Sequence, residues 1–190
     1  HSEVLRYDTQ SAFDAAGSWT TFDPTANGVS SGGGYYGAVF DGRYVYIIPH
    51  YNGTSHFGQF VRYDTQGDFG STNAWSAYDP GPAGVGSDPD GYFGGVFDGQ
   101  YVYFVPYHNG SAYFGEVLRF DVRGEFKATE SWTTYTPASS GIGTAPRGFR
   151  CGAFDGRHVY FVPYYNGSTF SGEVMRYDAK NPPEVPATVS

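Results

Sequence analysis

Three segments of the sequence place Tyr and Asn side chains together, two of them with His, and each segment begins with a proline. They read "PHYNGTSHFG" from Pro49, "PYHNGSAYFG" from Pro106 and "PYYNGSTFSG" from Pro163. Aromatic rings stack on the apolar C–H faces of sugars, while amides and hydroxyls hydrogen-bond sugar hydroxyls. The segments therefore predict a glycan-binding rim that is repeated along the chain, so that binding gains from avidity. The candidate ligand-binding residues are His50, Tyr51, Asn52, Tyr107, His108, Asn109, Tyr164, Tyr165 and Asn166.

The same residues have a purely structural interpretation. Asn-Gly pairs build tight hairpin turns, and tyrosines such as Tyr44 and Tyr46 are typical packing residues between sheets. Asn52, Asn109 and Asn166 also stand in N-G-T or N-G-S sequons, which accept glycans in a secretory pathway. Turn chemistry explains their exact repetition more simply, and the sequence does not determine the compartment of the protein.

Other chemistry is weakly represented. His50, His56 and His108 are metal-ligand types, but they lie in different repeats at different offsets, so we expect them not to converge. Cys151 is the only cysteine, which excludes an intrachain disulfide and a multi-cysteine metal site. No nucleophile triad or phosphate-binding loop is recognisable. We therefore expect no catalytic residue, no metal and no cofactor.

The charge balance excludes one class of partner. Asp and Glu number 19 against 11 Lys and Arg, for a formal net charge of −8. This balance repels phosphate backbones, so we expect no nucleic acid partner. The sequence has no apolar run long enough for a membrane span and no recognisable leader, so we expect no membrane partner either.

The rim segments belong to a longer internal repeat. Phe-Asp-Gly triplets begin at Phe40, Phe97 and Phe154, 57 residues apart. Tryptophans and Arg-aromatic-Asp triplets recur at almost the same period. The repeats cover about residues 3–58, 59–115 and 116–172, followed by an extra strand at 173–178 and a Pro-rich tail at 179–190, which we expect to be disordered.

Each repeat contains the patterns of four short strands and no helical periodicity. Strand A reads "YYGAVF", "YFGGVF" or "FRCGAF", strand B reads "RYVYIIP", strand C reads "GQFVRYD" or "GEVLRFD", and strand D reads "SWTTFDP" or "AWSAYDP". The Asp-Gly pair between A and B predicts a type I′ hairpin, and the proline ends strand B. In strand C, Arg and Asp stand two residues apart on one strand face, which predicts that these arginines pair with a strand or turn carboxylate.

This pattern resembles the kelch type of β-propeller repeat. The resemblance rests on Tyr-Asp at the end of a strand, a Trp about 11 residues later, a Gly-rich strand and "VYFVP", and it covers residues 3 to 178. The chain departs from kelch repeats where their glycine doublet is replaced by the rim segment. The resemblance implies an all-β propeller of four-stranded antiparallel blades. Kelch-type folds host binding modules, sugar-binding proteins and a few enzymes, so the fold alone does not decide the function.

The number of strands bears on how a ring would close. The order is C-D, then A-B-C-D twice, then A-B-C, which gives about three blades per chain, while closed propellers have typically four to eight. We expect identical chains to complete one another, as a six-bladed dimer in preference to a nine-bladed trimer. Three function classes stay open: a non-catalytic binding module for a glycan or small polar ligand, a self-assembling propeller fragment of natural or engineered origin, and an enzyme at the channel mouth.

Overall fold

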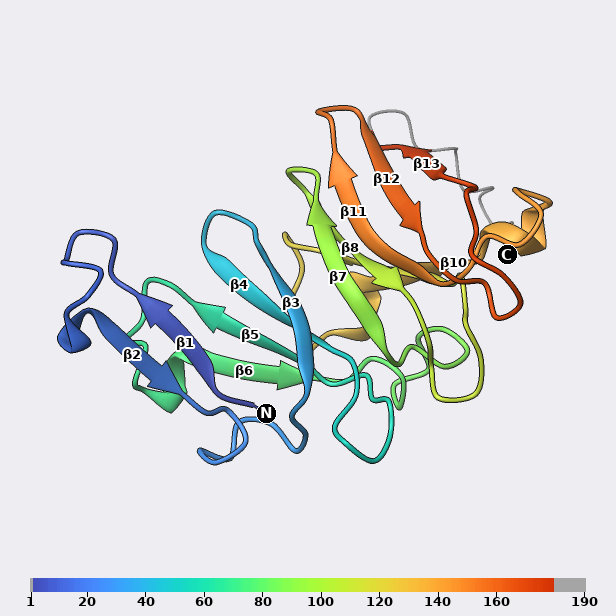
Figure 1. The fold of residues 1–190 in the computed structure, drawn as a ribbon. Coiled ribbons are helices and arrows are strands. Elements are labelled where there is room, and N and C mark those ends of the chain that lie inside the picture. The colour runs from blue at the N-terminus through green and yellow to red at the C-terminus, as the bar shows by residue number, and fades with distance from the viewer. Residues whose placement is uncertain (1, 180–190) are drawn as a thin grey trace.

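The computed structural model describes residues 2–179, and the predicted disordered tail lies outside the described residues except for Ala179. The described chain is all-β, with antiparallel sheets joined by turns, loops and short 3-10 segments (Figure 1). The expected near-absence of helix is confirmed, and two of the four sheets are the expected four-stranded antiparallel units. No helix in residues 2–179 is long and apolar enough to cross a membrane.

Four sheets follow one another along the chain. The first contains β1 (Val4–Tyr7) and β2 (Trp19–Phe22), and the second contains β3 (Tyr35–Phe40), β4 (Tyr44–Pro49), β5 (Phe60–Asp64) and β6 (Trp75–Tyr78). The third contains β7 (Tyr92–Phe97), β8 (Tyr101–Pro106), β9 (Val117–Asp121) and β10 (Trp132–Tyr135). The fourth contains β11 (Phe149–Phe154), β12 (His158–Pro163) and β13 (Met175–Asp178). The 3-10 segments are η1 (Ala16–Ser18), η2 (Thr72–Ala74), η3 (Thr129–Ser131) and η4 (Pro137–Ser140).

The sheets stack face against face, and the three hydrophobic clusters of the core lie between successive sheets. The middle cluster joins Ile48 and Phe60 of the second sheet to Phe104 and Trp132 of the third. The rings of Phe104 and Trp132 are stacked with centroids 5.7 Å apart, and those of Phe60 and Phe104 are 4.3 Å apart. Such offset aromatic packing supplies large apolar area in a fixed geometry.

The first strands of the successive sheets, β3, β7 and β11, lie side by side (Figure 1). Glycines make this approach possible, because a Cβ on Gly37 would stand 3.4 Å from Gly94 Cα, and one on Gly95 would press on Val39 at 2.9 Å. Cys151 replaces glycine at this place in β11 and is exposed.

The turn between strands A and B is a two-residue hairpin, but it differs from the expected type. Asp41 N–H donates to Tyr44 O at 3.1 Å, which leaves Gly42 and Arg43 as the loop. Gly42 has a φ of 104°, while no non-glycine residue in the described chain has a positive φ. A type I′ turn needs two positive φ values, so that prediction is wrong, and a single positive φ at the first loop position fits type II′.

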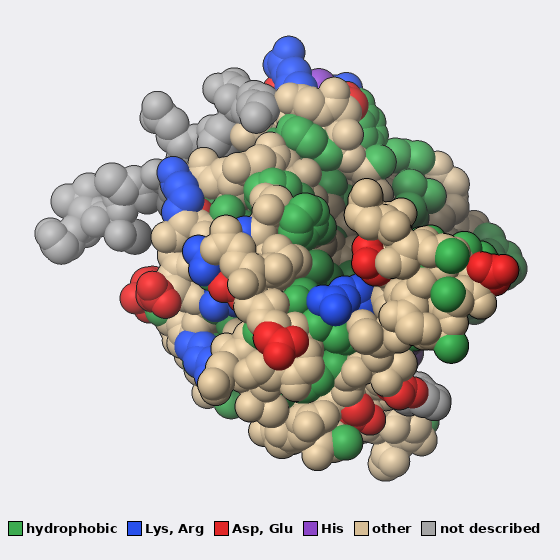
Figure 2. Space-filling model, turned by 90° about the vertical axis from the view of Figure 1, so that its left-hand side faces the viewer, with side chains coloured by type: hydrophobic (Ala, Val, Ile, Leu, Met, Phe, Trp, Pro, Cys, Tyr) green, Lys and Arg blue, Asp and Glu red, His purple; other side chains and the backbone are tan. Residues whose placement is uncertain are grey.

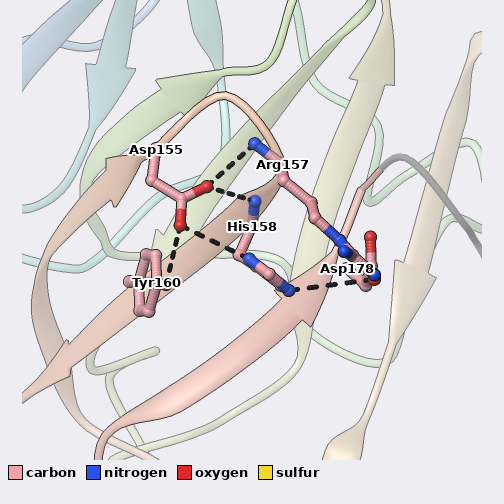
Figure 3. A network of polar contacts seen from close by, with 5 residues as sticks. All are labelled: Asp155, Arg157, His158, Tyr160 and Asp178. Carbon is pink, nitrogen blue, oxygen red and sulfur yellow. Dashed lines mark hydrogen bonds and ion pairs between the residues drawn. The ribbon is translucent and has the colours of Figure 1, made fainter.

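The aspartate before each of these glycines fastens the turn to strand B (Figure 3). Asp155 Oδ1 accepts the backbone N–H groups of Arg157 and His158 at 2.8 and 2.6 Å, and Asp155 Oδ2 accepts the Tyr160 hydroxyl at 2.8 Å. Arg157 then pairs with Asp178 at the end of β13 at 2.7 Å. These hydrogen bonds hold the pKa of Asp155 well below its usual range.

Within residues 2–179, the strand C arginines Arg62 and Arg119 do not make the expected ion pairs. The guanidinium carbon of Arg62 lies 4.2 Å from the ring centroid of Tyr44, and that of Arg119 lies 4.2 Å from the ring centroid of Tyr101. The carboxylates at the ends of strands C pair instead with loop arginines, Arg43 with Asp64 and Arg123 with Asp121, each at 2.7 Å. The prediction is wrong for Arg62 and Arg119 because their side chains lie on aromatic faces, where a cation is attracted by the ring quadrupole.

The turn network predicts a difference between a buried and an exposed copy of one hydrogen bond. In the third sheet, the Tyr103 hydroxyl donates to Asp98 Oδ2 at 3.0 Å, and both residues are buried. Tyr103→Phe should lower the free energy of unfolding by about 1.5 kcal/mol or more, because a buried carboxylate oxygen loses a donor. The matched control is Tyr160→Phe, which removes the same bond from the exposed Asp155. Urea unfolding of both variants should show the larger loss for Tyr103→Phe, and equal losses would contradict the role of burial.

Candidate functional site

The three predicted rim segments are the turns between strands B and C, and each is closed by its asparagine. Asn52 Oδ1 accepts the backbone N–H groups of Thr54 and Ser55, both at 2.9 Å. Asn109 and Asn166 make the same pair of bonds in their own turns. The turn interpretation of these asparagines is confirmed. Their amide oxygens accept these backbone hydrogen bonds, so mainly the amide N–H groups would be available to a ligand.

Glycines in the loops between strands D and A hold these turns in place. Gly91 O accepts the His108 N–H at 3.2 Å, and Gly148 O accepts the Tyr164 N–H at 3.1 Å. A Cβ on Gly91 would collide with the carbonyl oxygen of His108, and the φ of Gly91 is 67°. Only glycine allows both this close approach and this backbone conformation at low cost. The loop before each sheet is therefore docked onto the turn of the same sheet.

The docked turns bring six aromatic and imidazole rings into a continuous line, here called the outer row. The ring centroids of Tyr51 and His56 are 5.1 Å apart, and those of His56 and His108 are 4.9 Å apart. Tyr113 continues the line at 4.7 Å from His108, and Tyr165 follows at 5.0 Å from Tyr113. Phe170 ends it, 5.5 Å from Tyr165.

A second line, the inner row, lies beside the first. Its members stand at the start of strand A or directly after the proline of strand B, and they are Tyr36, His50, Phe93, Tyr107, Arg150 and Tyr164. The ring centroids of Tyr36 and Phe93 are 3.7 Å apart, and those of Phe93 and Tyr107 are 5.0 Å apart. The guanidinium carbon of Arg150 lies 3.8 Å from the ring centroid of Tyr164. We call the two rows together the aromatic belt.

Two adjoining cavities open on the belt where the turns of the third and fourth sheets meet. One has a volume of about 320 Å³ and is lined by His108, Ser111, Ala112, Tyr113, Arg147, Asn166, Gly167 and Ser168. The other, of about 310 Å³, shares Tyr113 and Arg147 with the first and extends over the loop from Thr136 to Pro146. The first cavity combines a ring, hydroxyls, an amide, an imidazole and a guanidinium, which is the set of groups that a small polar ligand requires.

The histidines converge, contrary to the sequence prediction. His56 lies between the rings of His50 and His108, with centroids 5.3 and 4.9 Å away. The prediction was wrong because the turns of neighbouring sheets lie side by side. Residues at non-equivalent positions of two repeats, such as His56 and His108, can therefore make contact. Within residues 2–179, no group of three His, Cys, Asp or Glu side chains is arranged to hold a metal ion. The observed role of the imidazoles is ring packing.

Burial and mutual proximity keep this histidine cluster uncharged. Burial lowers the pKa of His56 to about 4, and the neighbouring imidazoles of His108 and His50 add to the shift. Burial also lowers the pKa of His50 and of His108. At neutral pH, each imidazole therefore acts as a neutral hydrogen-bonding ring and carries no positive charge.

The structure brings the predicted ligand residues onto one rim, with different roles for each type. Two of them, His108 and Asn166, line the polar cavity. The sequence analysis missed Tyr36, Phe93, Tyr113, Arg147, Arg150 and Phe170. The repeat could have revealed them, because they stand at equivalent positions of successive repeats. Tyr36, Phe93 and Arg150 are the second residues of strand A, and Arg147 lies just before strand A. Tyr113 and Phe170 follow the Asn-Gly pair by a few residues.

No model of a known protein family matches the chain, and no curated protein matches it. The kelch resemblance therefore stays a prediction that rests on the repeat motifs.

The shifted pKa of His56 predicts a specific loss of stability in acid. The unfolded chain binds a proton near pH 6.5, while folded His56 binds one only near pH 4. Stability from neutral His56 is complete above pH 6.5 and is lost as the pH falls toward 4. His56→Tyr, which copies Tyr113 of the next repeat, should reduce this loss in urea unfolding followed across that pH range.

The comparison of parent and variant is necessary because another group acts in the opposite direction. Burial, and then repulsion from Asp88 and Asp79, raises the pKa of Asp90 to about 6. Protonation of folded Asp90 adds stability as the pH falls below about 6. This contribution is present in both proteins and cancels in their difference. An unchanged pH dependence in His56→Tyr would show that His56 titrates normally.

Proposed function

We propose that the two four-stranded sheets are complete blades of a β-propeller, that the first and fourth sheets are partial blades, and that the aromatic belt is its ligand-binding face. The successive packing of four-stranded antiparallel sheets and the adjacent first strands support this architecture. In such a fold, the first strands surround the central channel, and the turns between B and C share one face with the loops between D and A. The belt then rims one mouth of the channel.

We further propose that the ligand is a carbohydrate and that the protein is a non-catalytic binding module. The observation that carries this proposal is the cavity at Tyr113, where one aromatic ring stands among His108, Asn166 and Ser168. The belt supplies further rings on both sides of it, including the exposed Tyr51 and Phe170. Rings bind the C–H faces of pyranoses, and hydroxyls and amide N–H groups bind sugar hydroxyls. Several shallow contacts along one belt suit an oligosaccharide, whose units are bound together.

Removing the ring that both cavities share tests the carbohydrate proposal. Tyr113→Ala should weaken binding of a glycan identified on an array by about fivefold, since stacking on one ring contributes about 1 kcal/mol. Titration calorimetry would measure the affinity, and thermal unfolding would establish that the variant is folded.

The control for this variant is Phe40→Ala. Phe40 is exposed and stands beside the Asp-Gly turn, at the opposite end of the strands. This variant should bind as the parent does. The carbohydrate proposal fails if the parent binds no glycan on the array, or if folded Tyr113→Ala binds as tightly as the parent.

A second candidate function, self-association, is favoured by the outer faces of the first and fourth sheets. Leu5 of β1 is 60% exposed, while the matching Val61 and Leu118 of the inner sheets are fully buried. At the other end, Val174 is 58% exposed, while the matching Phe60 is fully buried. Figure 2 shows the side of the molecule that lies at the left in Figure 1, where hydrophobic side chains gather around a basic side chain.

The two exposed faces are complementary in position. Leu5 and Val174 occupy successive places of the strand C motif, so they lie on opposite faces of their sheets. The first sheet exposes the face that, in the inner sheets, packs against the preceding sheet. The fourth sheet exposes the face that, in the inner sheets, packs against the following sheet. We propose that two copies of the chain close a six-bladed ring, with a trimer as the less favoured closure. In this ring β1 and β2 of one copy join β11 and β12 of the other copy in one shared blade, and either β1 or β13 is displaced because the shared blade has room for only one strand C.

Charging one of these faces tests the self-association. Light scattering of the parent should give twice the chain mass of 20.7 kDa. Leu5→Asp should shift it toward the single-chain mass, because a buried unpaired carboxylate is strongly unfavourable. Ile142→Asp places the same charge on an exposed apolar loop residue and should leave the mass unchanged. A parent that is stable at the single-chain mass would contradict the proposal.

A further inference from the structure

One position of the rim changes its charge from repeat to repeat. The residue before each docked glycine is Gly33 in the first loop, Asp90 in the second and Arg147 in the third. The following glycine accepts backbone N–H groups from the adjacent turn in all three cases, so the three positions are structurally equivalent. Backbone packing does not require the change, because the same docking contact is made with each residue.

Arg147 has an unusual electrostatic environment. Its side chain is exposed and lines both cavities. Within residues 2–179 it makes no ion pair, whereas Arg43, Arg123 and Arg157 each pair with a carboxylate at 2.7 Å. The acidic side chain that serves the same loop, Glu173, accepts the backbone N–H groups of Thr144 and Ala145. A guanidinium without a counterion therefore faces the cavity in a protein with a net charge of −8.

A second arginine stands three residues further along the chain. Arg150 is held by aromatic faces, with its guanidinium carbon 4.8 Å from the ring centroid of Phe93 and 5.3 Å from that of Tyr107. It donates a hydrogen bond of 3.4 Å to the Tyr107 hydroxyl. It too makes no ion pair among the described residues. Aromatic faces orient a guanidinium without neutralising it, so the positive charge stays available to a ligand.

The equivalent junction between the second and third sheets has the opposite character. Asp90 replaces Arg147 there, and Asp79 and Asp88 lie near enough to repel it. This junction disfavours an anion, so a charged ligand would distinguish the two junctions of the belt. The residue before the docked glycine thus differs in charge between repeats, while the backbone hydrogen bonds of that glycine stay the same.

We propose that the cavity at Tyr113 binds a saccharide that carries a carboxylate, such as a uronic acid unit, with Arg147 as the residue that recognises the carboxylate. This inference rests on the carbohydrate function proposed above and narrows its ligand class. The planar guanidinium can form two parallel hydrogen bonds with a carboxylate, which would fix the orientation of a uronate in the cavity. Tyr113 offers its ring to the sugar, while Asn166 and Ser168 stand close enough along the wall to bind its hydroxyls.

Two ligands that differ in the charge of the carboxyl group provide the test. Oligogalacturonate and its fully methyl-esterified form share one sugar backbone, and calorimetry can measure the affinity of each. We expect the parent to bind the acidic form at least tenfold more tightly, with an affinity that falls as salt is added. Arg147→Asp, which copies Asp90 of the preceding repeat, should abolish this preference while leaving the thermal unfolding temperature close to that of the parent.

The control variant is Arg123→Ala, which removes an exposed arginine of the loop between β9 and β10, at the opposite end of the strands. It should keep the preference for the acidic ligand. Equal affinity for the two forms, or a preference that survives in Arg147→Asp, would overturn the inference and leave the carbohydrate function standing. Binding of a sulfated oligosaccharide alone would overturn the choice of carboxylate. If no saccharide binds the parent, both the inference and the proposed function are wrong.

Discussion

The structure depends on the packing of one sheet face against the next. No single sheet of this chain encloses a core, because each has two apolar faces and the hydrophobic clusters lie between sheets. Burying a large apolar side chain contributes about 1.5 to 3 kcal/mol, so a sheet without a neighbour leaves much of its stabilisation unrealised. This constraint explains why Leu118 is fully buried while its counterpart Leu5 is exposed.

The same packing produces the aromatic belt. Neighbouring sheets place their B-to-C turns side by side, and the docked glycines fix each loop against its turn. Rings from different repeats then meet edge to face, as Tyr113 and Tyr165 do at 5.0 Å. The belt is therefore both a packing device and an accessible surface. Under the proposed function, ligand specificity would arise where the repeats differ, since identical repeats would offer only identical sites.

Much of the local structure was predictable. The strand boundaries, the alternation of buried positions and the turn residues follow from periodicity and from glycine and asparagine chemistry. The hairpin type was predicted wrongly because Asp-Gly was taken as the pair of loop residues, while the register makes Asp41 a flanking residue and Gly42 the first loop residue. The partners of Arg62 were also mispredicted, since proximity along a strand does not reveal the ring of Tyr44 on the neighbouring strand.

The sequence by itself determined the repeat, the order of the four strand types and the Asn-Gly turns between strands B and C. These features depend on residues that lie near one another along the chain. Only the tertiary structure decided which repeats meet, and so brought His50, His56 and His108 together and set Arg147 beside Tyr113 in one cavity. The physical reason is that contacts between sheets join residues separated by most of a repeat. The distance between two such residues depends on how the sheet faces pack, and it cannot be calculated from the spacing of motifs in the sequence.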